Sequence, residues 1–171
     1  MPGKQGLAIA MLFSAPSWSI GDPVALYVTG NVKAAPCQIS SDSVTKTVDL
    51  TADQSVTASS MYTPGSTTPW VAFDLSVENC PAGTTQVTVM FNGSPDQNQP
   101  QDRYQNVGTA TPVAVQLQSR DGQPLGDGKS LSGQVESQRY TWQLRARIVS
   151  QQGHVMPGTV NAVVTVSMTY Q

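Results

Sequence analysis

The side chains that most often carry catalysis are few in this sequence, and their spacing does not assemble a site. A serine or cysteine nucleophile needs a nearby base, and the single histidine, His154, lies in a polar stretch beside Gly153. The carboxylates that could form a general acid–base pair are scattered along the chain: Asp49, Asp74, Glu78 and Glu136. Three further aspartates lack the ligand spacing of a calcium loop: Asp96, Asp102 and Asp121. The sequence therefore predicts a protein that is not an enzyme, with no catalytic residues, no metal site and no cofactor.

Two cysteines, Cys37 and Cys80, offer a different chemistry. Neither belongs to a C-x-x-C pair, and one histidine cannot complete a zinc site with them. We predict one structural disulfide formed in an oxidising compartment, with two buried free thiols as the alternative. Closing a loop of this length would stabilise the fold by about 4 kcal/mol in the chain-entropy model.

The overall composition favours β-structure and argues against binding of nucleic acid through charge. The 171 residues are enough for one domain with a sizeable core. Val, Thr, Ser, Gln, Gly and Pro are abundant, and turn-forming clusters separate short apolar alternations. The net charge is −2 and charged residues make up 12%, so no footprint for nucleic acid is visible.

The beginning of the sequence has the layout of a secretory signal peptide. Lys4 precedes an apolar run at residues 6–13, and Ser17 and Ser19 occupy the −3 and −1 places of a possible cleavage before Ile20. We predict a signal peptide at residues 1–19, with a disordered leader as the alternative. The apolar run is too short to span a bilayer.

The last fourteen residues, 158–171, alternate with period two and predict a half-buried strand. The apolar face would be Gly158, Val160, Ala162, Val164, Val166, Met168 and Tyr170. No further strand follows in the sequence to cover its edge, and an uncovered apolar edge invites aggregation. A second alternation lies before Cys37, with Val24, Leu26, Val28 and Val32 on one face. The two segments suggest subunits that complete each other, although the early strand could instead pair within its own chain.

The rest of the chain predicts an all-β antiparallel sandwich of immunoglobulin type. Strands are expected at residues 70–77, 85–91, 112–118 and 135–149. Residues 44–50 form a short alternating stretch, and residues 51–69 are expected to form a long polar loop. Residues 135–149 should bury Tyr140, Trp142, Leu144, Ala146 and Ile148. Arg145 and Arg147 should face water, and with Arg139 they are interpreted as one solvated face.

Several of these segments together resemble the chaperone–usher pilins. They are residues 26–32 (LYVTGNV) followed by Pro36-Cys37, residues 47–50 (TVDL), Asn79-Cys80-Pro81, residues 89–93 (VMFNG), residues 115–117 (VQL) before an Asp-Gly turn, and penultimate Tyr170. Each piece is weak alone, but the ordered set covers almost all of the mature chain. The resemblance is strongest to the minor adaptor subunits of the type 1 fimbrial tip.

The resemblance implies an incomplete immunoglobulin-like sandwich at residues 34–171 that lacks its last strand. An apolar groove would lie open beside the final strand, and a periplasmic chaperone would fill it and anchor the terminal carboxylate of Gln171. At the outer-membrane usher, the N-terminal extension of the next subunit would replace the chaperone strand, a known form of β-strand addition. The donor extension here would be residues 20–33, with Val24, Leu26, Val28 and Val32 facing the groove and Gly30 over a shallow part of it.

The expected function is therefore that of a structural fimbrial subunit, secreted through the periplasm to the bacterial surface. We expect a tip adaptor that links adjacent pilins by donor-strand exchange in cell adhesion. A major shaft subunit is the closest alternative. A carbohydrate-binding adhesin is a further one, since Trp70, Trp142 and Tyr140 could stack on sugar, but their strand positions favour burial in the core. A terminating subunit should lack a usable donor segment, which counts against that role.

Overall fold

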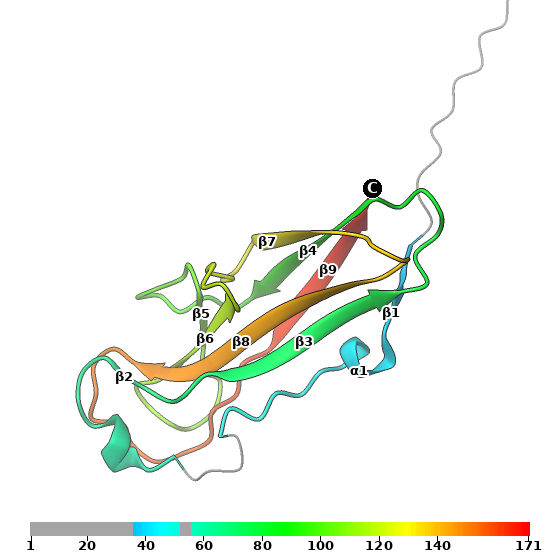
Figure 1. The fold of residues 1–171 in the computed structure, drawn as a ribbon. Coiled ribbons are helices and arrows are strands. Elements are labelled where there is room, and N and C mark those ends of the chain that lie inside the picture. The colour runs from blue at the N-terminus through cyan, green and yellow to red at the C-terminus, as the bar shows by residue number, and fades with distance from the viewer. Residues whose placement is uncertain (1–35, 52–55) are drawn as a thin grey trace, which may run out of the picture. The chain divides into compact units, whose positions relative to one another are not determined.

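The computed structural model describes residues 36–51 and 56–171, which form two antiparallel sheets packed face to face (Figure 1). The expected signal peptide and donor extension lie outside the described residues. No helix in the described part of the chain is both long and apolar enough to cross a membrane.

The larger sheet has the order β1-β3-β8-β6-β5. Its strands are β1 (Gln38–Ile39), β3 (Val71–Glu78), β8 (Tyr140–Ser150), β6 (Ala114–Ser119) and β5 (Arg103–Gln105), and the short β2 (Ser66–Thr67) also pairs with β8. The smaller sheet has the order β7-β4-β9, from β7 (Lys129–Gln134), β4 (Gln86–Gly93) and β9 (Val164–Tyr170). One helical turn, α1 (Ser41–Val44), and one 3-10 turn, η1 (Ala58–Met61), complete the described elements. The all-β immunoglobulin-like class predicted from sequence is confirmed.

The expected long strand at residues 135–149 is wrong at its start. The chain makes a tight turn at residues 136–139, where Ser137 and Gln138 have positive φ, and β8 begins at Tyr140. The segment before the turn is a separate strand, β7, which the sequence analysis missed. Its sequence, KSLSGQ, has one large apolar residue, Leu131, so the period-two signal is weak.

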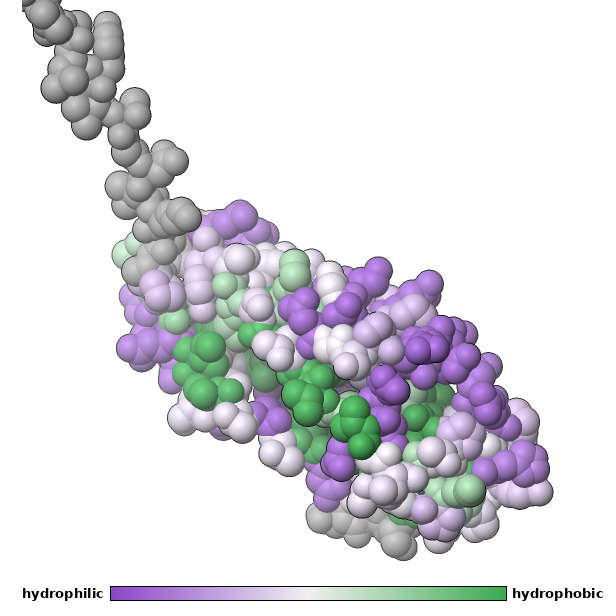
Figure 2. Space-filling view, turned by 180° about the vertical axis from the view of Figure 1, so that it is seen from behind, coloured by the Kyte–Doolittle hydropathy of each residue, from purple (hydrophilic) through white to green (hydrophobic). Residues whose placement is uncertain are grey.

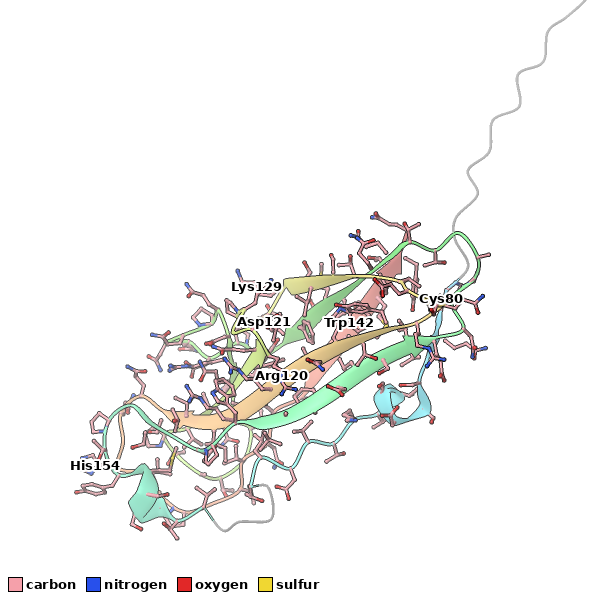
Figure 3. The ribbon with its side chains drawn as sticks, in the orientation of Figure 1. Cys80, Arg120, Asp121, Lys129, Trp142 and His154 are labelled. Atoms are coloured by element: carbon pink, nitrogen blue, oxygen red, sulfur yellow. A yellow bond between two sulfur atoms is a disulfide. The ribbon has the colours of Figure 1, made fainter. Side chains whose placement is uncertain are left out.

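The core lies between the two sheets and is closed by the predicted disulfide. Trp142, Phe91, Leu144 and Tyr104 are fully buried side chains in it, and Figure 3 shows Trp142 on β8 directed into the space between the sheets. Cys37 and Cys80 form the disulfide, and both residues are buried. The bond ties the chain just before β1 to the end of β3.

The structure corrects the expectation for Trp70 while confirming burial of Trp142. Trp70 is half-buried on the outer face of the larger sheet, and the guanidinium carbons of Arg145 and Arg147 lie 4.4 and 4.1 Å from its ring centroid. Cation–π contact with a tryptophan is favourable, so these arginines are partly covered and do not simply face water. Arg139 is exposed, as expected.

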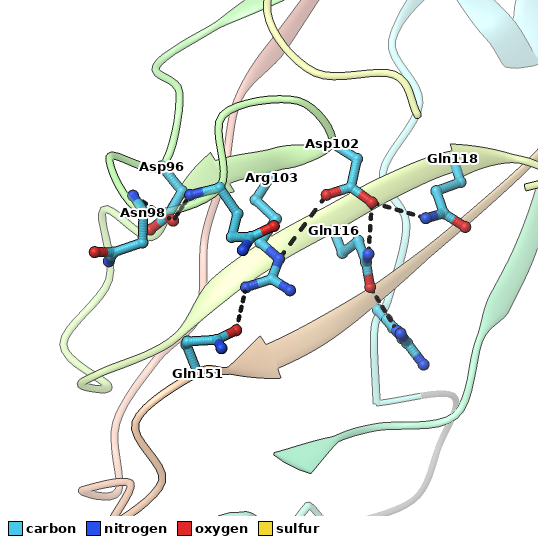
Figure 4. Close-up of polar contacts among 9 residues, drawn as sticks. Asp96, Asn98, Asp102, Arg103, Gln116, Gln118 and Gln151 are labelled. Atoms are coloured by element: carbon cyan, nitrogen blue, oxygen red, sulfur yellow. Dashed lines mark hydrogen bonds and ion pairs between the residues drawn. The ribbon is translucent and has the colours of Figure 1, made fainter. Parts of the chain in front are cut away.

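A polar cluster beside these arginines explains why several hydrophilic residues of the same face are buried (Figure 4). The Nε2 atoms of Gln116 and Gln118 donate to Asp102 Oδ2 at 2.5 and 2.7 Å. The Oε1 atoms of the same glutamines accept from Arg147 Nε at 2.7 Å and Arg145 Nη2 at 3.0 Å. Asp102 thus has a structural role: its Oδ2 accepts both glutamine bonds, and its Oδ1 lies 3.9 Å from Arg103 Nε.

Tyr104 provides a test of the core through pH. Its buried hydroxyl donates to the Leu125 carbonyl oxygen at 2.9 Å, and burial, with a smaller effect from the charge of Asp127, raises the pKa of the phenol well above its ordinary value of 10.0. The folded state therefore holds the proton more tightly than the unfolded chain. The stabilising contribution is complete below pH 10 and declines as the pH rises above it.

We expect Tyr104→Phe to lower the free energy of unfolding by about 1–2 kcal/mol at neutral pH, because the Leu125 carbonyl loses its buried donor. The variant should also lose stability less steeply than the wild type above pH 10. Denaturant unfolding at several pH values measures both effects, with the exposed Tyr62→Phe as control. Equal pH slopes for wild type and Tyr104→Phe would contradict this assignment.

Candidate functional site: an open groove beside β9

A long hollow of about 960 Å³ opens beside β9 and exposes part of the core. Its floor includes Leu75, Phe91, Val115, Leu117 and Ile148, all buried residues of the two sheets. Figure 2, seen from behind the view of Figure 1, shows hydrophobic residues exposed along the middle of this face. The hollow is an apolar groove between two sheets.

β9 forms one wall of the groove and has one free edge. It pairs with β4 from Val87↔Tyr170 to Gly93↔Val164, and no described residue forms a strand on its other side. The β4 side chains that face the core, Val87, Val89 and Phe91, are fully buried. Their β9 counterparts, from Val164 to Tyr170, are half-buried although they face the same core. The difference is what one missing neighbouring strand would produce.

The expected last strand begins six residues later than predicted. Residues 158–163 do not pair with β4. The chain there crosses to residues 106–110, through bonds from Val107 N–H to the Asn161 carbonyl at 2.8 Å and from Ala110 N–H to the Thr159 carbonyl at 3.0 Å. We call residues 106–110 and 158–161 the clasp.

Two features of the clasp explain the departure from a strand. Asn106 Oδ1 accepts from the backbone N–H groups of Gly108 and Asn161 at 2.9 and 2.8 Å, which turns the chain locally. A Cβ atom on Gly108 or on Gly158 would overlap backbone of the facing segment, so glycine permits the close approach. Alternation alone cannot reveal a side-chain contact of this kind.

The structure brings most, but not all, of the predicted acceptor residues to the groove. Gly158, Val160, Ala162, Val164 and Val166 line it. Met168 and Tyr170 are half-buried against the core beyond the lined region, with the Tyr170 hydroxyl 3.7 Å from the Met168 sulfur. Burial raises the pKa of the Tyr170 phenol.

Gln171, the predicted chaperone anchor, lies at the end of β9 beside the start of β4. One oxygen of its terminal carboxylate accepts from the N–H groups of Thr85 and Gln86 at 2.6 and 3.0 Å, and its N–H donates to the Gln86 carbonyl at 2.9 Å. These bonds fix the position of Gln171 beside the start of β4, beyond the residues that line the groove. Its role as an anchor stays a prediction.

The opposite wall was not identified from the sequence. Residues 46–51 form this wall without being a strand, and Val48 and Leu50 are half-buried in it. The alternation at residues 44–50 correctly indicated that one side of this segment is apolar. No strand of the described residues pairs with the segment. Residues around η1 and before the clasp close the far end of the groove: Val56, Ala58, Met61, Val155, Met156 and Pro157.

The groove offers packing and main-chain hydrogen bonding. Among residues 36–51 and 56–171, no cluster of three or more His, Cys, Asp or Glu side chains could hold a metal ion. His154 is exposed in the loop after β8, where its ring contacts that of Tyr62. An apolar floor beside a free strand edge suits the addition of one extended, alternating peptide.

Comparison with known proteins identifies the class of this fold. Residues 26–171 match the family described as "Fimbrial protein". Protein FimG of Escherichia coli (strain K12) is 32% identical over 170 residues, covering 98% of this chain and 97% of FimG.

Two solved structures share the fold. The P pilus rod subunit PapA superposes with a TM-score of 0.66 at 21% identity, covering 80% of this chain and 100% of the PapA chain. A subunit from the structure of a chaperone–usher pilus superposes with a TM-score of 0.65 at 22% identity, covering 92% and 100%. The chain therefore belongs to the fimbrial protein family.

Proposed function

We propose that this protein is a tip adaptor of a type 1-like fimbria, joined to two neighbouring pilins by donor-strand exchange. The observation that carries the proposal is the groove beside β9, whose core-facing residues are half-buried for want of one strand. Its own extension, residues 20–33, would fill the groove of one neighbour, and the extension of the other neighbour would fill the groove described here. The resemblance to minor tip subunits supports an adaptor in preference to a shaft subunit.

The energetics of strand addition support the proposal. Burying Val24, Leu26, Val28 and Val32 at roughly 1.5–3 kcal/mol each gives a gross gain on the order of 6–12 kcal/mol. A one-residue slip of the donor would turn every apolar side chain to water, so the register is strongly specified. Gly30 forfeits side-chain burial, which fits a position chosen for shape.

The same groove accounts for the proposed assembly route. Before assembly, a periplasmic chaperone would cover the free edge of β9 and hold the carboxylate of Gln171, because an open apolar edge promotes aggregation. At the outer-membrane usher, the incoming extension would displace it, and the subunit would reach the cell surface within the fimbria. The role is structural and requires no catalysis.

A synthetic peptide of residues 20–35 tests the donor assignment. We expect it to bind the groove of a chaperone-released neighbouring pilin and raise the melting temperature of that pilin markedly, because it supplies the missing strand. Thermal unfolding followed by circular dichroism measures the shift. A peptide carrying Leu26→Asp and a scrambled peptide are the controls, and equal stabilisation by all three would contradict the assignment.

Co-purification from the periplasm tests the adaptor role itself. The protein should travel with a chaperone before assembly, and with two different pilins after it. Recovery of long fibres made of this chain alone would favour a shaft subunit. A chaperone-free monomer that stays soluble, its extension folded back into its own groove, would contradict strand exchange.

A further inference from the structure

The groove ends on an exposed apolar surface at the end of the domain remote from the disulfide. This surface, which we call the distal patch, consists of Val56, Tyr62 and Met156 with His154 beside them. Val56, Tyr62 and Met156 are 36%, 59% and 58% exposed. Figure 3 places His154 at the opposite end of the domain from Cys80.

Backbone contacts hold the two loops of the distal patch together. The His154 N–H donates to the Tyr62 carbonyl at 2.8 Å, and the two rings meet edge to face with centroids 4.1 Å apart. The Met156 N–H donates to the Thr111 carbonyl at 2.7 Å. Val56 and Met156 also line the groove, so the patch is continuous with the proposed donor site. It is a fixed surface built from two separate loops.

The direction of the donor strand determines what lies next to this patch, an argument that rests on the proposed function. β9 runs from the clasp toward Gln171. Every strand pair in the described chain is antiparallel, and parallel pairing is slightly less stable per residue. An antiparallel donor would therefore run toward the clasp, and its carboxyl end would emerge beside the distal patch.

The short connection between extension and domain then brings a second body to the patch. In this chain, three residues separate the end of the extension at Lys33 from Cys37, which the disulfide fixes to the domain. Three extended residues span about 10 Å. A donor subunit built like this chain must therefore place the disulfide end of its own domain within about 10 Å of the clasp end of the acceptor's groove.

We propose that the distal patch is the docking surface for the globular domain of the pilin whose extension fills the groove. The two loops, residues 56–69 and 151–160, contain no Lys, Arg, Asp or Glu. The disulfide end of a domain like this one presents Ile39, which is 41% exposed, beside Pro36. The uncharged distal patch would therefore meet Ile39 and Pro36 at an end that also carries the exposed Glu78, and the contact would restrict the angle between consecutive subunits.

Site-specific photo-crosslinking in assembled fimbriae tests the docking surface. Tyr62, Met156 and Met90 are replaced one at a time by a photoreactive phenylalanine analogue in the full chain. Met90, 44% exposed on β4 of the smaller sheet, is the control for an exposed apolar side chain elsewhere. We expect positions 62 and 156 to crosslink several-fold more than position 90. Mass spectrometry should identify the product as the globular domain of the pilin whose extension occupies the groove.

A paired dissociation measurement separates this proposal from the groove itself. The variant Tyr62→Ser, at a residue that does not line the groove, should bind the neighbouring pilin's donor peptide as the wild type does, but release the intact neighbouring pilin several-fold faster. Normal fibre incorporation without crosslinks from positions 62 and 156, or with equal crosslinks from position 90, would overturn the docking surface alone. Failure to enter fibres or to bind any donor peptide would overturn the proposed function as well.

Discussion

Replacing Val166 with aspartate is expected to abolish completion of the groove by a donor strand. Val166 lies midway along β9, pairs with Phe91 of β4 and faces the open groove. In the free protein the new carboxylate can remain hydrated, but a donor strand would bury it among apolar side chains. A penalty of about 3 kcal/mol would weaken binding roughly 100-fold. Titration with the donor peptide of the pilin whose extension fills this groove, followed by tryptophan fluorescence, measures the loss.

Ser167 supplies the matched control for this experiment. It is the next residue on the same strand, and its side chain points to the exposed face of the smaller sheet. Ser167→Asp adds the same charge at the same depth along β9, yet the charge stays in water. Its peptide affinity should therefore match that of the wild type. Equal weakening by both substitutions would mean that the donor does not enter this groove.

Removing the disulfide should have the largest effect on the stability of the domain itself. The double variant Cys37→Ala with Cys80→Ala opens a loop that spans 43 positions. The chain-entropy model assigns about 4 kcal/mol to such a crosslink, which is a large part of the stability of an ordinary domain. The peptide-complemented variant should unfold at a much lower urea concentration than the peptide-complemented wild type.

Reduction of the wild-type protein is the control for packing changes caused by the alanines. Reduced wild type and the double variant should show similar urea midpoints, because both lose the same crosslink. A double variant within about 1 kcal/mol of the oxidised wild type would show that packing of β1 against β3 already restrains the chain.

The sequence predicted the sheets well where an apolar residue recurs at every second position. β3, β4 and β6 lie close to their expected ranges, because burial of one strand face leaves a regular trace in the sequence. β7 left no such trace. Gly133 takes a buried place in it, and the ring of Tyr140 occupies the space that a Cβ there would need.

The sequence predicted the wall of the groove that β9 forms, but not the wall formed by residues 46–51. Val164 and Val166 could be assigned from alternation and from the pilin resemblance. The beginning of β9 could not, because the Asn106 side chain and the close approach at Gly158 depend on a segment some fifty residues away. Trp70 was misplaced for a similar reason. Its strand neighbours favoured burial, but the arginines that cover it come from β8.

The bond between Cys37 and Cys80 also has a mechanical consequence. In a fibre assembled by strand exchange, tension would enter each subunit through the chain just before Cys37. The covalent link passes that tension directly to the end of β3, the strand that pairs with both β1 and β8. The two residue pairs between β1 and β3 are then spared from being peeled apart one after the other. Under shear flow, the subunit would resist extension until a whole strand slides.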